Sequence, residues 1–157
     1  MGCDIHMYSE TFIDNEWVAD EASTYIPADD ENFSEMAEFN NTPRNYWFFG
    51  LIASGVRSDF PWSLEDKGFP EDASKEIADM YSQWGSGAHT PSYLTHLELE
   101  NLYNTLPIIQ AEQLISQTDS HYSDALLAHK LALKEHIDGF DPGVDKSHQR
   151  IVFWFDN

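Results

Sequence analysis

The first segment of the chain alternates apolar and polar side chains over residues 3–12. One expected face carries Cys3, Ile5 and Met7, and the other carries Asp4, His6, Tyr8 and Glu10. A period of two is typical of a β-strand, because successive side chains leave a strand on opposite sides. Asp14-Asn15 then predicts a turn and residues 16–18 a returning strand, so the chain is expected to open with a β-hairpin.

The last segment, residues 150–155, is apolar on both expected faces. Ile151, Phe153 and Phe155 alternate with Val152 and Trp154. Such a strand is usually interior to a sheet and covered on both sides. We therefore expect it beside the N-terminal strand, with helices packed on the sheet.

Between these strands the spacing of apolar residues predicts helices at 46–53, 73–84 and 95–106, a further helix from Pro107, and a last helix from Asp119 or Ser120 to about Asp138. Residues 58–70 and the Gly-rich stretch 85–92 are expected to be loops. The fold class is therefore α+β. We expect a small, mostly antiparallel sheet, with the N-terminal hairpin beside the C-terminal strand, packed with several α-helices in one domain over 1–157.

Residues 20–41 are acidic and irregular and contain no basic residue. We expect a long surface excursion here, in which Phe33, Met36, Ala37 and Phe39 could anchor a short helix. The whole chain of 157 residues carries a net charge of −20, with eight Lys and Arg in total. Direct contact with nucleic-acid phosphates is therefore not expected, because so few cationic side chains are available. Such acidity is compatible with a solvated surface, with divalent-cation binding, or with mimicry of nucleic acid toward a basic partner.

The remaining composition narrows the class of protein. A hydrophobic content of 41% with 14% aromatics argues against disorder, and a single cysteine, Cys3, excludes an internal disulfide. No apolar run is long enough to cross a bilayer, and the N-terminus lacks the regions of a signal peptide. His6 stands where a myristoylation signal has Ser or Thr. These features predict a cytoplasmic protein with no membrane contact.

Asp4-x-His6 is the most suggestive chemical pair, because both side chains would leave one face of the strand. A carboxylate and an imidazole can share a divalent ion such as Zn²⁺ or Mn²⁺. Glu10 follows on the same face. Alternatively, His6 bonds a backbone carbonyl and Asp4 pairs with Arg44 or Arg150.

Two further residues could complete a site. His89 lies in the Gly-rich stretch ahead of a helix, where it is either a ligand or an exposed loop histidine. Arg44 could clamp an anionic group of a small molecule through bidentate contacts, or serve an internal ion pair. By contrast, His129 and His136 share a helix face with leucines and are expected at the edge of the core.

Several blocks of the chain resemble a family of uncharacterised bacteriophage and prophage proteins. The blocks are the opening Met1-Gly2-Cys3-Asp4-Ile5-His6 with Glu10, then Arg44-Asn45-Tyr46, residues 68–74, His89 with residues 92–95, and the closing residues 150–157. Gly87 and Pro91 replace an Asp and a His of the family pattern around His89. The resemblance implies a phage accessory protein of the host cytoplasm, acting in host takeover or defence evasion, and implies no particular activity.

Two functional hypotheses follow, besides a purely structural role. The first is a metal-dependent hydrolase or pocket protein for a phosphorylated or nucleotide-like small molecule. Asp4, His6 and His89 would hold the ion, Glu10 would be the general base and Arg44 would receive the anionic group. The second is a non-enzymatic inhibitor that presents residues 14–38 as a nucleic-acid mimic to a basic host or defence protein. The first is favoured, because a strand beside an interior strand should not carry a polar face without a role.

Overall fold

In a computed structural model of the chain, four strands form one antiparallel sheet in the order β2-β1-β4-β3. The structure describes residues 2–40, 42–116 and 120–157, and for 107–116 and 120–124 it describes the helical backbone alone. The strands are β1 (Asp4–Ile13), β2 (Glu16–Ala19), β3 (His89–Thr95) and β4 (Gln149–Asp156). The predicted α+β class, with the N-terminal hairpin beside the C-terminal strand, is confirmed.

The hairpin forms where the alternation predicted it. Asp14 and Asn15 both have positive φ, 51° and 66°, and occupy the two positions between β1 and β2. Two left-handed residues give the turn a twist that matches the twist of paired strands, and Asp and Asn tolerate this conformation better than most residues. The chain therefore turns back so that β2 pairs with β1, and β2 is an outer strand of the sheet.

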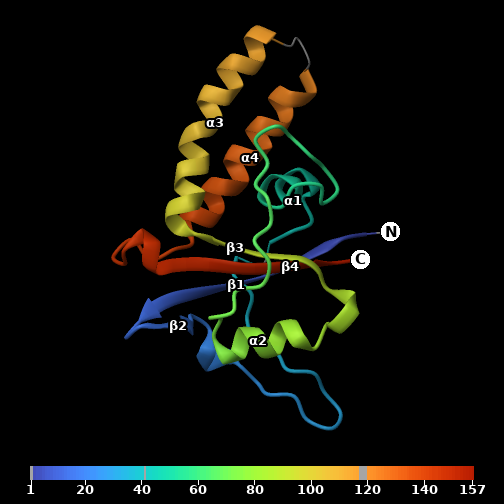
Figure 1. Ribbon diagram of the computed structural model, residues 1–157, viewed down its shortest axis with the longest axis vertical. Helices are drawn as coiled ribbons and strands as arrows, with labels where there is room; N and C mark the ends of the chain where they lie inside the picture. The colour runs from blue at the N-terminus through green and yellow to red at the C-terminus, as the bar shows by residue number, and fades with distance from the viewer. Residues whose placement is uncertain (1, 41, 117–119) are drawn as a thin grey trace.

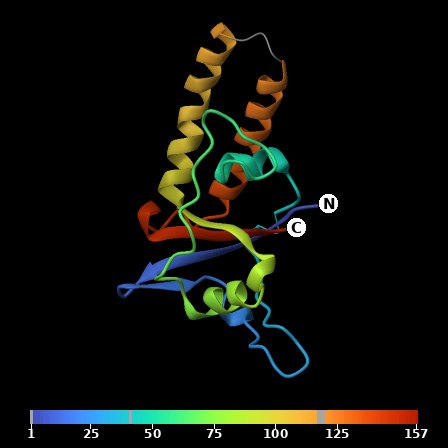
Figure 2. The same ribbon diagram turned by 45° about the vertical axis from the view of Figure 1, so that its right-hand side comes forward.

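The doubly apolar strand β4 lies inside the sheet, as its sequence predicts. Ile151, Phe153 and Phe155 contribute to a core under α1 (Tyr46–Ile52), α3 (His96–Ser116) and α4 (Ser120–Asp138). Val152 and Trp154 contribute to a second core on the opposite face, under α2 (Lys75–Ser82). Figure 1 shows α1, α3 and α4 on one side of the sheet and α2 on the other, and Figure 2 shows α3 and α4 extending from the sheet as a paired arm.

Local signals set the helix starts. The Asn45 side chain accepts a hydrogen bond from the Phe48 amide at 3.1 Å and so caps α1. Thr95 and Glu98 form the expected capping box, in which each side chain accepts from the other residue's amide, at 3.1 Å and 2.8 Å. None of the helices in the described ranges has the length and apolarity that a membrane span requires.

Three sequence predictions of local structure were wrong. The stretch expected to be a loop contains β3, an outer strand whose register shifts between His89 and Ser92, and this irregularity accommodates Pro91. The two helices expected on either side of Pro107 are one continuous helix, α3. Residues 33–39 form no helix, because Glu35 instead pairs with Ile26 in an isolated β-bridge.

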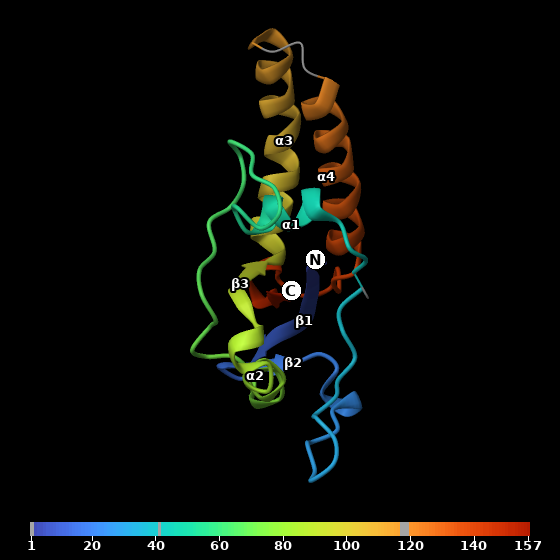
Figure 3. The same cartoon turned by 90° about the vertical axis from the view of Figure 1, so that its right-hand side faces the viewer.

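The acidic segment projects as a loop from the end of the molecule opposite to the α3–α4 arm (Figure 3). Backbone hydrogen bonds between Ile26 and Glu35, of 2.8 Å and 3.0 Å, close its neck. Beyond the neck, the buried side chains of Met36 and Phe39 return the chain to the sheet, where the Phe39 amide donates to the Met7 carbonyl at 2.7 Å. The loop is thus held to the sheet at its base by hydrogen bonds and buried side chains.

Candidate functional site

Asp4, His6, Tyr8 and Glu10 share the α2 side of the sheet, as the alternation of β1 predicts. The register pairs Asp4 with Asp156, His6 with Trp154, Tyr8 with Val152 and Glu10 with Arg150. Directly paired residues of antiparallel strands project to the same face. The polar residues of β1 therefore lie beside the residues of β4 that project to the same face. Each of them contacts a partner on β4 or in a nearby loop.

Glu10 and Arg150 form a buried ion pair. Arg150 Nε donates to Glu10 Oε1 at 2.8 Å, and the side-chain exposures are 3% and 0%. The second oxygen of Glu10 accepts the Ser74 amide at 2.6 Å, and Arg150 Nη2 donates to Asp72 at 2.9 Å. Glu10 is fully buried and both of its carboxylate oxygens accept hydrogen bonds from the protein. It therefore stabilises the fold and has no open space beside it for a substrate.

The Arg150 guanidinium is also enclosed by aromatic rings from both outer strands. It lies 4.0 Å from the centre of the Trp17 ring on β2 and 5.2 Å from that of Tyr93 on β3. A planar cation over an aromatic face is attracted by the ring's negative face. This one side chain of β4 therefore contacts a residue of every other strand in the sheet.

Asp4 and Arg44 form a second ion pair, at the surface. Arg44 Nε and Nη2 donate to the two Asp4 oxygens at 2.8 Å and 2.7 Å, a bidentate arrangement. Hydrogen bonds from Arg44 hold the pKa of Asp4 below its usual range. Arg44, which was expected to bind a substrate anion, thus binds Asp4, which was expected to bind a metal. This ion pair is the alternative that the sequence left open for Asp4.

His6 lies between two carboxylates that the sequence reasoning did not connect with it. Its Nδ1 is 2.9 Å from Glu38 Oε1 and its Nε2 is 3.4 Å from Asp156 Oδ2, while its ring packs 4.3 Å from that of Trp84. Burial alone would lower the pKa of His6, but the hydrogen bonds to both carboxylates outweigh it and the pKa is raised. The imidazole therefore ties the acidic segment, through Glu38, to both terminal strands.

The Tyr8 phenol also donates to Glu38, at 3.4 Å, and burial followed by the charge of Glu38 raises the pKa of Tyr8. Glu38 is far from both partners in the sequence, 32 residues from His6 and 30 from Tyr8. No local pattern marks Glu38 or Asp156 as a partner of His6. Only the register of β1 and β4 and the return of residues 36–39 onto β1 bring them together.

His89 lies on the other face of the sheet from His6. It pairs with Phe155, and the two rings stack at 5.9 Å on the side of the α1, α3 and α4 core. His6 pairs with Trp154, which faces α2. Neighbouring residues of a strand project to opposite faces. The structure therefore does not bring Asp4, His6 and His89 together, and the described residues hold no trio of His, Cys, Asp or Glu arranged to share an ion.

The two helix histidines are core residues, as expected. His129 is fully buried, donates from Nε2 to the Trp47 carbonyl at 3.0 Å and accepts the Trp62 indole N–H at 3.4 Å. Burial lowers the pKa of His129 to about 4 and also lowers that of His136. Both imidazoles are therefore neutral near pH 7 and serve packing and hydrogen bonding.

Exposed carboxylates gather around the hairpin turn and on the projecting loop, and we call this region the acidic surface. Its eight carboxylates, all exposed, are Asp14, Glu16, Asp20, Glu21, Asp29, Asp30, Glu31 and Glu35. No ion pair among the described residues involves any of them. The first Lys or Arg of the chain is Arg44, so neighbouring sequence supplies no compensating cation.

Apolar side chains are exposed among these carboxylates. Of the seven large hydrophobic residues exposed in the described part of the chain, four belong to the acidic surface: Ile13, Val18, Ile26 and Phe33. Phe33, at 74%, is the most exposed of them. Exposed apolar residues rimmed by polar ones are typical of protein interaction sites. From the sequence, Phe33 was expected to help anchor a short helix, but it is exposed on the loop. An aromatic residue among acidic ones gives no sign of its direction.

The loop that carries Phe33 is shaped by specific hydrogen bonds. The Asp29 carboxylate accepts the amides of Glu31 and Asn32 at 2.9 Å and 2.7 Å, which folds the tip. At the base, the Ser34 hydroxyl donates to Gln83 at 2.7 Å, and the Gln83 amide group donates back to the Ser34 carbonyl at 3.0 Å. A preformed loop loses little conformational entropy on binding a partner.

Comparison with models of protein families, with curated proteins and with solved structures finds no match for this chain. The resemblance of its blocks to a bacteriophage family therefore stays a prediction.

We predict that Glu10→Gln destabilises the protein by about 3 kcal/mol or more, because it leaves the buried Arg150 guanidinium without its charge partner. Urea unfolding measures the change. Asp4→Asn is the control, since its ion pair with Arg44 is about half exposed, at 51% and 49%, and should change stability little. Equal effects of the two substitutions would contradict a structural role for the buried pair.

Acidification is predicted to destabilise the fold through His129 and His136. The folded pKa values lie below the ordinary value of 6.5, so between pH 7 and 5 the unfolded chain binds protons that the folded chain does not. The free energy of unfolding should fall by roughly 2 kcal/mol for His129 alone. His6 has the opposite sign: its raised pKa contributes stability below pH 6.5 that is lost as the pH rises through the folded value.

Histidine NMR titrations combined with urea unfolding at pH 5 and 7 test both statements. His129 should not titrate above pH 5, and the His6 midpoint should lie above 6.5. An ordinary midpoint for His129, or one below 6.5 for His6, would contradict the assigned environments.

Proposed function

We propose that this protein is a non-enzymatic binding protein that docks its acidic surface onto a basic surface of another protein. The observation that carries the proposal is the concentration of eight exposed, uncompensated carboxylates and four exposed apolar side chains between Ile13 and Glu35. Charge brings a basic partner to this surface quickly and aligns it, and the apolar contacts then slow its release.

The mixture of charge and apolar area favours a protein partner over a metal ion. A cation site needs carboxylates that converge on one point, whereas these carboxylates are spread from the hairpin turn to the loop tip. An exposed phenylalanine adds nothing to ion binding, but an aromatic residue at the centre of an interface is a frequent anchor. A basic protein that normally binds nucleic acid presents the complementary field.

The roles of the opening strand support the same choice. Glu10 and Arg44, the residues expected to act in catalysis, hold Arg150 and Asp4. His6 bonds Glu38, which lies at the return of the acidic loop. The polar face of β1 therefore has a role in building the fold and fixing the loop, and an enzyme site is no longer needed to account for it.

If the bacteriophage resemblance holds, the partner is a host or defence protein of the host cytoplasm, and the protein acts by occupying that partner's nucleic-acid surface. Inhibition by mimicry requires carboxylates at the spacing of phosphates and a surface that stays ordered before binding. The hydrogen bonds of Asp29 and of the Ser34–Gln83 pair provide that order.

The triple variant D30N/E31Q/E35Q is predicted to weaken partner binding about tenfold, since each exposed ion pair contributes up to about 1 kcal/mol. It leaves Asp29, which folds the loop, in place. The matched control E65Q/D66N/E71Q removes three exposed carboxylates elsewhere and changes the net charge equally. Immobilised wild-type and variant proteins are compared by the proteins that each retains from bacterial lysate at low and high salt.

The expected result is a set of basic proteins that wild type and control retain at low salt and that the triple variant loses. Phe33→Ser should lose the same set without a change in thermal stability, because Phe33 is 74% exposed. If the triple variant and its control retain the same proteins, the acidic surface is not the binding site. If no basic protein is retained at any salt concentration, the proposal fails.

A further inference from the structure

A pocket of about 340 Å³, which we call the hairpin pocket, opens between the β1–β2 hairpin and the start of α2. Its wall includes Glu16, one of the eight carboxylates of the acidic surface, so the pocket borders that surface. The hairpin also contributes Phe12 and Trp17, and the segment that leads into α2 contributes Asp72 and Ser74. Pockets that accept small organic groups have volumes of about 300 Å³ or more. The hairpin pocket is therefore large enough for one long side chain of a partner.

The charges around the hairpin pocket do not balance. The Arg150 guanidinium is shared by two carboxylates, those of Glu10 and Asp72. Lys75, in the pocket wall, pairs at 2.6 Å with a carboxylate one turn further along α2. Glu16 forms no ion pair with any described residue, and the second oxygen of Asp72 accepts no hydrogen bond from them. The pocket is therefore net negative, with carboxylate oxygens left for a cationic ligand.

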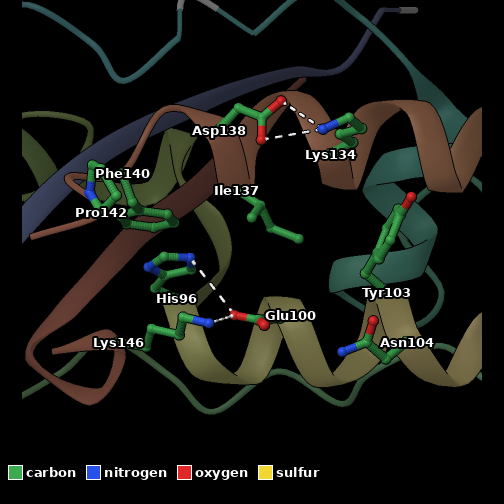
Figure 4. A pocket seen from close by; sticks show the side chains of 10 residues that line it. All are labelled: His96, Glu100, Tyr103, Asn104, Lys134, Ile137, Asp138, Phe140, Pro142 and Lys146. Carbon is green, nitrogen blue, oxygen red and sulfur yellow. Dashed lines mark hydrogen bonds and ion pairs between the residues drawn. The ribbon is translucent and has the colours of Figure 1, made fainter.

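The larger cavity at the base of the α3–α4 arm, of about 720 Å³, differs in this respect. Figure 4 shows that its charged side chains form ion pairs with one another, Lys134 with Asp138 and Lys146 with Glu100. Cations and anions therefore balance there and leave no net charge for a ligand. An excess of one sign distinguishes the hairpin pocket from this cavity.

Ser74 adds a buried polar group without a partner to the hairpin pocket. The residue is 7% exposed, and its Oγ has no hydrogen-bond partner among the described residues. Ser74 occupies the N-cap position of α2, yet its side chain accepts no amide of the helix. Its own amide donates to Glu10 at 2.6 Å, so a carboxylate already lies at the positive end of the helix. An unpaired buried hydroxyl costs free energy, and a ligand that donates to Ser74 Oγ would remove that cost.

Two aromatic side chains complete the wall of the pocket. Phe12 and Trp17 are both partly exposed, and their ring centroids lie 5.2 Å apart. The Trp17 ring already packs against one guanidinium, that of Arg150, at 4.0 Å. Aromatic rings beside carboxylates with free oxygens suit arginine, whose planar group stacks on rings and donates to carboxylates at once. A lysine ammonium is a compact point charge and gains less from such a wall.

We propose that the hairpin pocket takes up an arginine side chain of the basic protein that docks on the acidic surface. The guanidinium donates to Glu16, to the free oxygen of Asp72 and to Ser74 Oγ, and it packs against Phe12 and Trp17. The source of the arginine rests on the proposed function, which brings a basic partner to this surface. One arginine held in a pocket fixes how that partner is oriented, whereas exposed carboxylates attract any basic surface.

The test uses the full chain and three capped amino acids as probes: the acetyl methylamides of arginine, lysine and citrulline. Citrulline has the shape of arginine without its charge. At constant ionic strength, NMR shift mapping should show saturable millimolar binding of the arginine probe at Phe12, Trp17 and Ser74. The lysine probe should bind about threefold more weakly and the citrulline probe about tenfold more weakly.

Ser74→Ala should weaken binding of the arginine probe about fivefold. It should not lower the thermal midpoint, because the hydroxyl that it removes has no partner in the free protein. Ser82→Ala is the matched control, since Ser82 is an exposed serine at the other end of the same helix. Glu16→Gln should weaken the probe about threefold. Glu21→Gln removes an exposed carboxylate of the acidic surface outside the pocket and should leave probe binding unchanged.

The arginine site is ruled out if the arginine probe does not saturate at millimolar concentration or binds no better than the citrulline probe. It is also ruled out if arginine and lysine probes bind alike with shifts spread over the acidic surface, or if Ser74→Ala binds the arginine probe as wild type does. None of these results touches the proposed function, which the retention experiment tests separately. Conversely, saturable arginine binding in the pocket, with no basic protein retained from lysate, would contradict the proposed function and support the arginine site.

Discussion

The buried pair of Arg150 and Glu10 is the interaction on which the rest of the structure depends. Arg150 contacts Glu10 on β1, Trp17 on β2 and Tyr93 on β3, and it reaches Asp72 ahead of α2. Removing two charges from water is costly, and the pair repays it only with complete hydrogen bonding, which the Ser74 amide and Asp72 help to supply. A one-residue slip of β4 would send Arg150 into the apolar core under α1, so the pair fixes the register of the sheet.

That register decides which residues are left for function. The polar face of β1 closes on partners within the molecule, and His89 is carried to the opposite face. Eight exposed carboxylates without an ion pair among the described residues lie close together in the sequence, where the hairpin and the loop project beyond the sheet. Like charges on a compact chain repel one another and lower its stability, so an ordered surface of unpaired carboxylates is a cost to the fold. A basic partner removes that repulsion on binding, which is the physical reason for assigning the function to this surface.

The sequence predicted what depends on neighbouring residues, and long-range pairing decided the rest. The alternation over residues 3–12, the Asp14-Asn15 turn and the Thr95–Glu98 capping box are local, and each formed as expected. The strand β3 was missed because Pro91 argues against a strand until an irregular outer position accommodates it. The partners of Glu10 and His6 could not be predicted for a related reason, because they are distant in the sequence. Glu10 and Arg150 lie 140 residues apart, and nothing in one sequence reveals which charges will be buried together.

The central claim is that the molecule binds through its acidic surface and that its opening strand builds the fold. Hydrogen exchange of the chain, free and bound to a retained basic protein, tests it most directly, because protection reports where the partner lies. The account predicts added protection at residues 14–18 and 20–36, with the amides of residues 4–12, of β4 and of the α3–α4 arm unchanged. Protection concentrated on the arm or around β3, with the loop exchanging as in the free protein, would contradict it.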